Sequence, residues 1–171
     1  MKYILKLALT LLLITAVVAG LLAFVNELTK DKIAENTARK ANEAMQTVLP
    51  SGSYEKIELT KDGITEAYKS ENGYVVRLNA NGFGGTIDMM VGVDLNGNVT
   101  GVSVISHAET ASLGAECTRE DWRAQFVGAT GGLKVTKDGG TIDALTGATV
   151  TSRAVTEAVN RAVEFVKEVQ P

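Results

Sequence analysis

Asp143-Ala144-Leu145-Thr146-Gly147-Ala148-Thr149-Val150-Thr151-Ser152-Arg153 stands directly before a long helical pattern. From Ala154 onward, Ala-Val pairs recur every four residues, at 154/155, 158/159 and 162/163, and Val166 and Val169 continue the series. Apolar residues at this spacing form one stripe of an amphipathic helix. The hydroxyl-rich stretch is therefore predicted to lie where this helix begins.

A helix start is a favourable place for an anion. Its first backbone N–H groups have no partner within the helix, and the macrodipole places partial positive charge there. A phosphate group is stabilised at such a terminus, and Gly147 and Ala148 let the backbone approach it closely. The alternative is that Thr149 or Thr151 only caps the helix, because hydroxyl side chains are common at this position.

The composition excludes several classes of function. A chain of 171 residues with net charge −3 predicts one moderate domain with an appendage, and it offers no basic patch for nucleic acid. One cysteine, Cys117, and one histidine, His107, cannot form an internal disulfide, a CxxC pair or a metal cluster. No Gly-x-Gly-x-x-Gly opens a helix, which argues against direct NAD binding, and no nucleophile–base pair marks a catalytic residue.

The N-terminal region predicts a membrane anchor. Leu7 to Val25 carries no charge, and 19 residues of helix at about 1.5 Å each span roughly the hydrocarbon core of a bilayer. A cleaved signal peptide is the alternative, although the apolar run is long for one. We expect an anchor with a cytoplasmic tip over residues 1–25, a linker helix over 26–50 and a folded domain over 51–171.

Periodicity then predicts an α+β fold with a small antiparallel sheet and a C-terminal helix. The linker helix has an irregular apolar stripe and ends before Pro50-Ser51-Gly52. Asn-Gly turns indicate two hairpins, and the Gly82–Gly85 run lacks the ending of a phosphate loop, which favours a bulge or a close backbone approach. The stripe contains Leu28, Ile33, Ala34, Ala41, Ala44, Met45 and Val48; the predicted strands are 64–69 with 74–79, 86–94 with 99–106, and the short segments 133–135 and 141–142.

The block Asp-x-x-Thr-Gly-Ala-Thr-x-Thr-Ser, from Asp143 to Ser152, resembles the flavinylation motif of the FMN-binding domain family. That family includes the G subunits of Rnf electron-transport complexes and the C subunits of the Na⁺-pumping NADH:quinone reductase. The resemblance implies FMN esterified through its phosphate to Thr149, installed from FAD by a separate flavin transferase with Mg²⁺. Arg153 could neutralise the phosphate or be a solvated helix residue. The matching cofactor-binding positions are Asp143, Thr146, Gly147, Ala148, Thr149, Thr151 and Ser152.

Two further segments resemble the same family. His107, Glu109, Thr110, Leu113 and Gly114 match its His-x-Glu-Thr-Pro-Gly-Leu-Gly segment, which lies close to the flavin, but Ala111-Ser112 replaces Pro-Gly. This departure leaves the shape of the turn undecided, and with it a contact of His107 or Glu109 with the flavin. The alternative is that both are ordinary loop residues. Trp122, Gln125 and Phe126 match a Trp-x-x-Gln-Phe pattern, for which core packing of the aromatic rings is the simplest explanation.

The resemblance implies an electron-relay protein of a larger complex rather than an enzyme that acts alone. It places the chain in the bacterial cell membrane as a single-pass protein with a cytoplasmic N-terminus and an extracytoplasmic C-terminal domain. Its partners would be membrane lipid and the other membrane subunits of an Rnf-type complex, which exchanges electrons between ferredoxin and NAD⁺ and moves Na⁺ or H⁺. The alternatives are a relative of the quinone reductase C subunits, a free-standing extracellular flavoprotein, and a non-redox membrane-anchored binding module.

Overall fold

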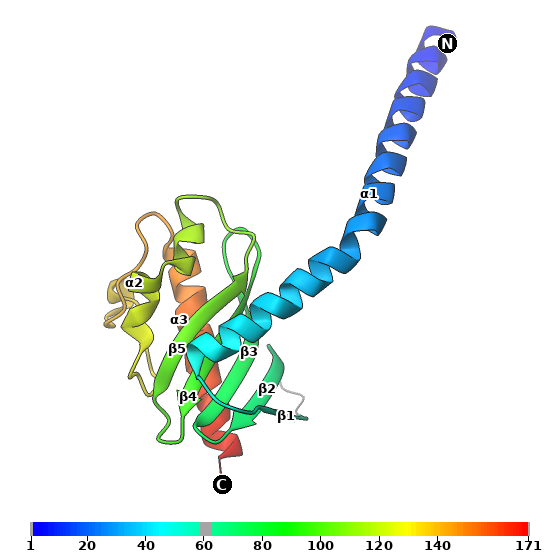
Figure 1. Cartoon of the computed structure of the whole chain (residues 1–171). Coiled ribbons are helices and arrows are strands. Elements are labelled where there is room, and N and C mark those ends of the chain that lie inside the picture. The colour runs from blue at the N-terminus through cyan, green and yellow to red at the C-terminus, as the bar shows by residue number, and fades with distance from the viewer. Residues whose placement is uncertain (1, 59–62, 171) are drawn as a thin grey trace. The chain divides into compact units, whose positions relative to one another are not determined.

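The computed structural model describes residues 2–58 and 63–170 and divides the chain into two compact units, Met1–Arg39 and Lys40–Pro171 (Figure 1). One helix, α1 (Lys2–Val48), makes up the described part of the first unit and ends in the second. It is long and apolar enough to cross a membrane, and no part of its apolar window is buried, which suggests membrane anchoring.

The helix continues without a break from the predicted anchor through the predicted linker. Leu28 and Ile33 of the expected linker stripe are exposed. Only the last part of the stripe packs, and its buried members are Ala41, Ala44, Met45 and Val48. The linker helix thus contributes its last two turns to the core of the second unit.

In the described part of the chain, five antiparallel strands form the sheet in their order along the sequence. Both predicted hairpins are confirmed, and the α+β class with them. The three-residue strand β1 was not predicted, because so short a segment shows no alternation. The strands are β1 (Glu55–Ile57), β2 (Ile64–Ser70), β3 (Gly73–Asn81), β4 (Thr86–Asp94) and β5 (Val99–Ser106); after them come η1 (Gly114–Thr118), α2 (Glu120–Arg123), η2 (Ala124–Phe126), η3 (Thr136–Asp138) and α3 (Thr149–Val169).

One face of the sheet packs against α3. The predicted Ala-Val pairs of this helix are buried, and they share one core with alternate residues of β3 such as Val76 and Leu78. Trp122 and Phe126 join this core edge to face, with ring centroids 5.3 Å apart. Burial raises the pKa of the Cys117 thiol to about 11, so this side chain stays a protonated core group.

The opposite face packs against the end of α1. Val75, Met90 and Ile105 share a second core with the buried residues of that helix. Its last residue, Val48, lies directly on the sheet backbone, and the Thr100 hydroxyl donates a hydrogen bond to the Val48 carbonyl. A Cβ on Gly92 would stand 2.4 Å from that carbonyl oxygen, so only glycine leaves room for this contact.

We expect Gly92→Ala to destabilise the second unit by about 2 kcal/mol, because the added methyl group meets backbone that cannot move without breaking the helix–sheet contact. Chemical denaturation monitored by circular dichroism measures the change. Gly52→Ala is the matched control, since a Cβ on Gly52 has no neighbour within 4 Å. Equal stability of the two variants would contradict the packing described for Val48.

The segments 133–135 and 141–142 do not form the predicted strands. Val135 and Ile142 make a single parallel bridge, and η3 fills the segment between them. Gly139 closes this turn with a φ of 78°, a left-handed conformation that suits glycine. The turn leaves too few residues on either side for a ladder, so a compact loop leads into the start of α3.

Candidate functional site

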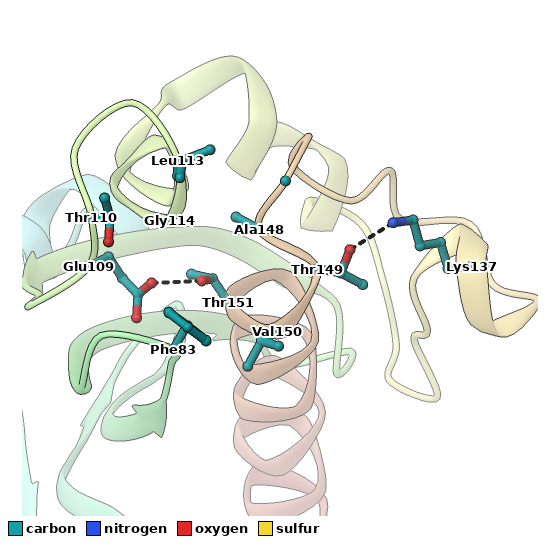
Figure 2. A pocket seen from close by; sticks show the side chains of 11 residues that line it. Phe83, Glu109, Thr110, Leu113, Gly114, Lys137, Ala148, Thr149, Val150 and Thr151 are labelled. Atoms are coloured by element: carbon teal, nitrogen blue, oxygen red, sulfur yellow. Dashed lines mark hydrogen bonds between the residues drawn. The ribbon is translucent and has the colours of Figure 1, made fainter.

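A cavity of about 420 Å³ lies beside the start of α3 (Figure 2). This volume is within the usual range of small-molecule sites. Three segments that are far apart in the sequence form most of its wall: the turn between β3 and β4, the loop after β5, and the first turn of α3. The lining residues are Phe83, Glu109, Thr110, Leu113, Gly114, Lys137, Gly147, Ala148, Thr149, Val150 and Thr151.

Glu109 connects all three segments. Its side chain is 9% exposed, and its carboxylate accepts hydrogen bonds from the Thr151 hydroxyl at 2.7 Å and from the Gly84 backbone N–H at 2.9 Å. A Cβ on Gly82 or on Gly114 would stand 2.0 Å from one of the carboxylate oxygens. The close backbone approach predicted for the glycine run is therefore confirmed, with the Glu109 carboxylate as the neighbour.

The turn at Ala111-Ser112 keeps a closed shape despite its departure from Pro-Gly. The backbone N–H groups of Leu113 and Ala115 both donate to the Thr110 carbonyl, at 3.2 and 3.1 Å. Ser112 has a φ of 59°, and it is the single non-glycine residue with positive φ in the described part of the chain. Serine thus adopts, at a steric cost, the conformation that glycine adopts freely.

Ser112→Gly is expected to stabilise the domain by about 0.5–1 kcal/mol, because it removes the strain of the left-handed conformation. Ala111→Gly is the matched control: its φ is not positive, so added chain entropy should make it neutral or destabilising. Urea denaturation of both variants measures the difference. A destabilised Ser112→Gly protein would contradict the strain at this turn.

The loop before α3 is held by side chains at both ends. The Trp122 indole N–H donates to the Asp143 carbonyl at 2.7 Å, and the Asp143 backbone N–H donates to the Gln125 side-chain oxygen at 2.7 Å. Further along, the Ser152 hydroxyl accepts from the Leu145 N–H and donates to the Ala148 carbonyl, both at 2.9 Å. Trp122 therefore does more than fill the core, because it and Gln125 fix the backbone at the first residue of the motif.

Helix α3 begins at Thr149, and the hydroxyl cap considered from the sequence is wrong. Ala148 occupies the cap position, and no side chain caps the helix there. The Thr149 hydroxyl instead accepts a hydrogen bond from Lys137 Nζ at 2.9 Å, while that of Thr151 is directed to Glu109. The Thr149 side chain thus does not cap the helix; the residue lines the cavity, and its hydroxyl is directed to Lys137 (Figure 2).

Arg153 does not line this cavity. Its guanidinium forms a two-pronged ion pair with Asp138 at 2.7 and 2.6 Å, and hydrogen bonding to Arg153 lowers the pKa of the Asp138 carboxyl. The side chain is partly solvated but paired. Lys137 is the cation of the cavity wall, and its position had not been predicted from the sequence.

The structure brings seven of the eleven predicted cofactor residues to the cavity: Gly147, Ala148, Thr149, Thr151, Glu109, Thr110 and Leu113. Asp143 and Thr146 are exposed on the loop before α3, and Ser152 is buried in the first turn of α3. His107 accepts the backbone N–H of Glu109 at Nδ1, 3.2 Å away, and does not line the cavity.

Apolar side chains surround the cavity. Phe83 is 77% exposed, Val150 48% and Leu113 44%, and each comes from a different wall segment. Exposed apolar groups that gather around a cavity indicate a binding site more than isolated ones do. Phe83 and Val150 had no individual signal in the sequence, because their neighbours in space are distant along the chain.

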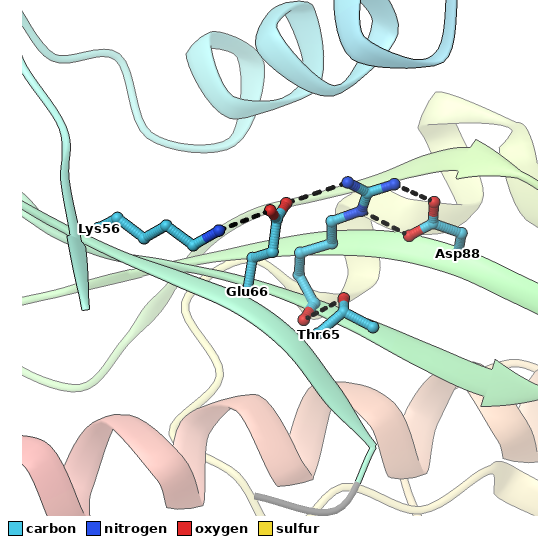
Figure 3. A network of polar contacts seen from close by, with 5 residues as sticks. Lys56, Thr65, Glu66 and Asp88 are labelled. Atoms are coloured by element: carbon cyan, nitrogen blue, oxygen red, sulfur yellow. Dashed lines mark hydrogen bonds and ion pairs between the residues drawn. The ribbon is translucent and has the colours of Figure 1, made fainter. Parts of the chain in front are cut away.

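A charged cluster stays outside the cavity, on the α1-packed face of the sheet (Figure 3). Arg77 pairs with Asp88 at 2.7 Å and with Glu66 at 3.0 Å, and Lys56 also reaches Glu66 at 3.0 Å. Burial alone would raise the pKa of Glu66, but hydrogen bonds from Lys56 and Arg77 outweigh it and lower that pKa. Opposite charges are thus matched within this cluster, which ties neighbouring strands together.

Comparison with known proteins gives two family matches. Residues 82–164 match the FMN-binding domain, and residues 1–48 match the RnfG N-terminal region. The G subunit of the ion-translocating oxidoreductase complex of Methanosarcina acetivorans is 35% identical over 96% of this chain and 95% of its own length. The chain belongs to the RnfG family. The family resemblance of the sequence is therefore confirmed.

Other RnfG relatives are similarly matched over nearly their whole length. The protein of the same name from Vibrio vulnificus is 32% identical over 94% of this chain and 88% of its own length. The G subunit of the proton-translocating ferredoxin:NAD(+) oxidoreductase complex of Clostridium ljungdahlii is 34% identical over 91% of this chain and 88% of its own length. The FMN-binding domain match contains every described residue that lines the cavity.

Proposed function

We propose that this RnfG protein relays electrons through FMN carried as a phosphoester on Thr149, in a membrane complex that couples ferredoxin:NAD⁺ electron transfer to Na⁺ or H⁺ translocation. The observation that carries the proposal is the placement of the Thr149 hydroxyl in the wall of a ligand-sized cavity within the FMN-binding domain. The name of the Clostridium ljungdahlii relative supports the electron partners and the ion coupling.

The residues of the cavity fit both halves of FMN. Phe83, Leu113 and Val150 offer apolar surface for a planar ring system. A phosphate joined to Thr149 would be held by the Lys137 ammonium, whose Nζ lies 2.9 Å from the Thr149 hydroxyl, and by the first N–H groups of α3, which no side chain caps. Bound FMN supplies the redox chemistry, since a flavin accepts two electrons and releases them singly, and the protein supplies attachment, orientation and charge.

Attachment through an ester needs only the hydroxyl of this chain. The Thr149 oxygen forms a bond to the phosphorus of the FMN half of FAD, and the pyrophosphate P–O bond breaks. AMP leaves, and the hydroxyl proton passes to a base of the flavin transferase. A covalent bond prevents loss of the cofactor by dilution, which matters most outside the cytoplasm, and it lets a shallow site hold a flavin without enclosing it.

The membrane arrangement rests on the N-terminal helix. Its apolar window suits insertion into lipid. Lys2 and Lys6 precede the span, but lysine and arginine residues also follow it, so the cytoplasmic N-terminus that we propose rests on the family resemblance rather than on the charge count. The FMN-binding domain then lies on the extracytoplasmic side. A C-terminal tag should accordingly be digested by protease added to intact spheroplasts, and protection of the tag would contradict this orientation.

The flavin proposal is tested by whether yellow fluorescence remains with the full-length chain after denaturation. The protein is produced with a flavin transferase, separated on a denaturing gel and examined under blue light. A fluorescent band at the position of the chain supports a covalent flavin. A dark band, beside a fluorescent control substrate of the same transferase, would favour the non-redox membrane-anchored module.

A further inference from the structure

Lys137 stands out because the Thr149 hydroxyl is already its hydrogen-bond partner. Its Nζ lies 2.9 Å from Thr149 Oγ1, across twelve residues of sequence (Figure 2). It is the one cationic side chain among the described residues that line the cavity, where Glu109 supplies the opposite charge. A cation this close to the ester oxygen is also within reach of the other oxygens of a phosphate bonded there.

The neighbouring residue fixes the turn that carries Lys137. Asp138 pairs with Arg153 through two hydrogen bonds, at 2.7 and 2.6 Å. Thr149 and Arg153 are four residues apart and therefore lie on the same side of α3. Lys137 and Asp138 are adjacent in η3 and thus contact adjacent turns on one face of α3. The ion pair between Asp138 and Arg153 therefore holds Lys137 beside Thr149.

We propose that Lys137 is the counterion of the phosphodiester on Thr149, and that the Asp138–Arg153 pair is its positioning device. This inference rests on the proposed function. The ester carries one negative charge. The Lys137 ammonium neutralises this charge from the position at which it now donates a hydrogen bond to the Thr149 hydroxyl. Lys137 also orients the Thr149 side chain toward the cavity before the ester is formed.

The test compares full-length wild type with Lys137→Gln, Lys137→Arg and Lys134→Gln. Lys134 is the matched control, because it lies on the same loop but lines a different cavity. Each protein is incubated with flavin transferase, FAD and Mg²⁺, and the initial rate of adduct formation is followed by intact mass. We expect loading of Lys137→Gln to slow about fivefold, as for a strong exposed ion pair, with substantial rescue in Lys137→Arg and no change in Lys134→Gln.

The second readout is the ³¹P resonance of the fully loaded proteins. Loss of the counterion should move this resonance in Lys137→Gln but not in Lys134→Gln, whereas a purely structural lysine would leave it in place. Unchanged loading and an unchanged resonance in Lys137→Gln, beside a loaded wild type, would overturn the inference alone. A wild type that acquires no adduct would overturn the proposed function and this inference with it.

Discussion

Replacing Thr149 by alanine is expected to abolish covalent flavin loading, whereas Thr149→Ser retains it. The alanine side chain offers no oxygen to the phosphorus, and the exposed Thr110 hydroxyl of the described cavity wall lies on the loop after β5, outside the motif that resembles the flavinylation site. Thr151 is completely buried and bonded to Glu109, and Thr146 does not line the cavity. The ratio of flavin absorbance to protein after gel filtration in denaturant measures the loading.

The same variant should fold normally. Thr149 does not cap α3, and its one side-chain hydrogen bond is with an exposed lysine, so Thr149→Ala should change the free energy of unfolding by no more than about 0.5 kcal/mol. This separates a missing attachment point from a misfolded domain. Retained flavin in a folded Thr149→Ala protein would show that another residue carries the cofactor.

Glu109→Ala is expected to lower the stability of the domain by about 2–3 kcal/mol, whereas Glu109→Gln should be nearly neutral. Alanine leaves the buried Thr151 hydroxyl and the Gly84 N–H without an acceptor. Glutamine can satisfy both, because its carbonyl oxygen accepts from Gly84 while its amide group donates to a rotated Thr151 hydroxyl. Thermal unfolding of the unloaded proteins measures the two effects, and the alanine variant should melt about 10 °C lower.

Glu157→Ala is the control for loss of a carboxylate, since Glu157 is exposed on α3. It should melt within a few degrees of the wild type. If Glu109→Ala melts as the control does, Glu109 does not hold the three wall segments together. If Glu109→Gln is as damaging as alanine, the negative charge itself, rather than the hydrogen bonds, stabilises the cavity.

Local patterns in the sequence predicted the main elements correctly. The repeated Ala-Val pairs indicated α3, and the Asn-Gly turns between β-branched runs indicated both hairpins. These signals work because periodicity and turn chemistry act over a few residues. The strands predicted at 133–135 and 141–142 did not form. Too few residues flank the tight turn between them for strand propensity to produce a ladder of backbone hydrogen bonds.

The site was only partly visible in the sequence, because much of it depends on long-range contacts. The motif identified Thr149, yet Lys137 reaches it from a separate loop, and Arg153, the cation next to the motif, is paired with Asp138 instead. The polar roles of Trp122 and Gln125 were hidden for the same reason, since each bonds to backbone about twenty residues away. Such pairings arise from the fold and leave no periodic signal.

The most direct test of the account is the site of the adduct in the wild-type chain. Trypsin should release residues 138–153 as one peptide, because Lys137 and Arg153 bound it and no lysine or arginine lies between. Fragmentation mass spectrometry of this peptide from protein matured with a flavin transferase distinguishes Thr149 from Thr146 and Thr151. We predict FMN, less one water, on Thr149 alone; an unmodified peptide, or an adduct on another residue, would contradict the account.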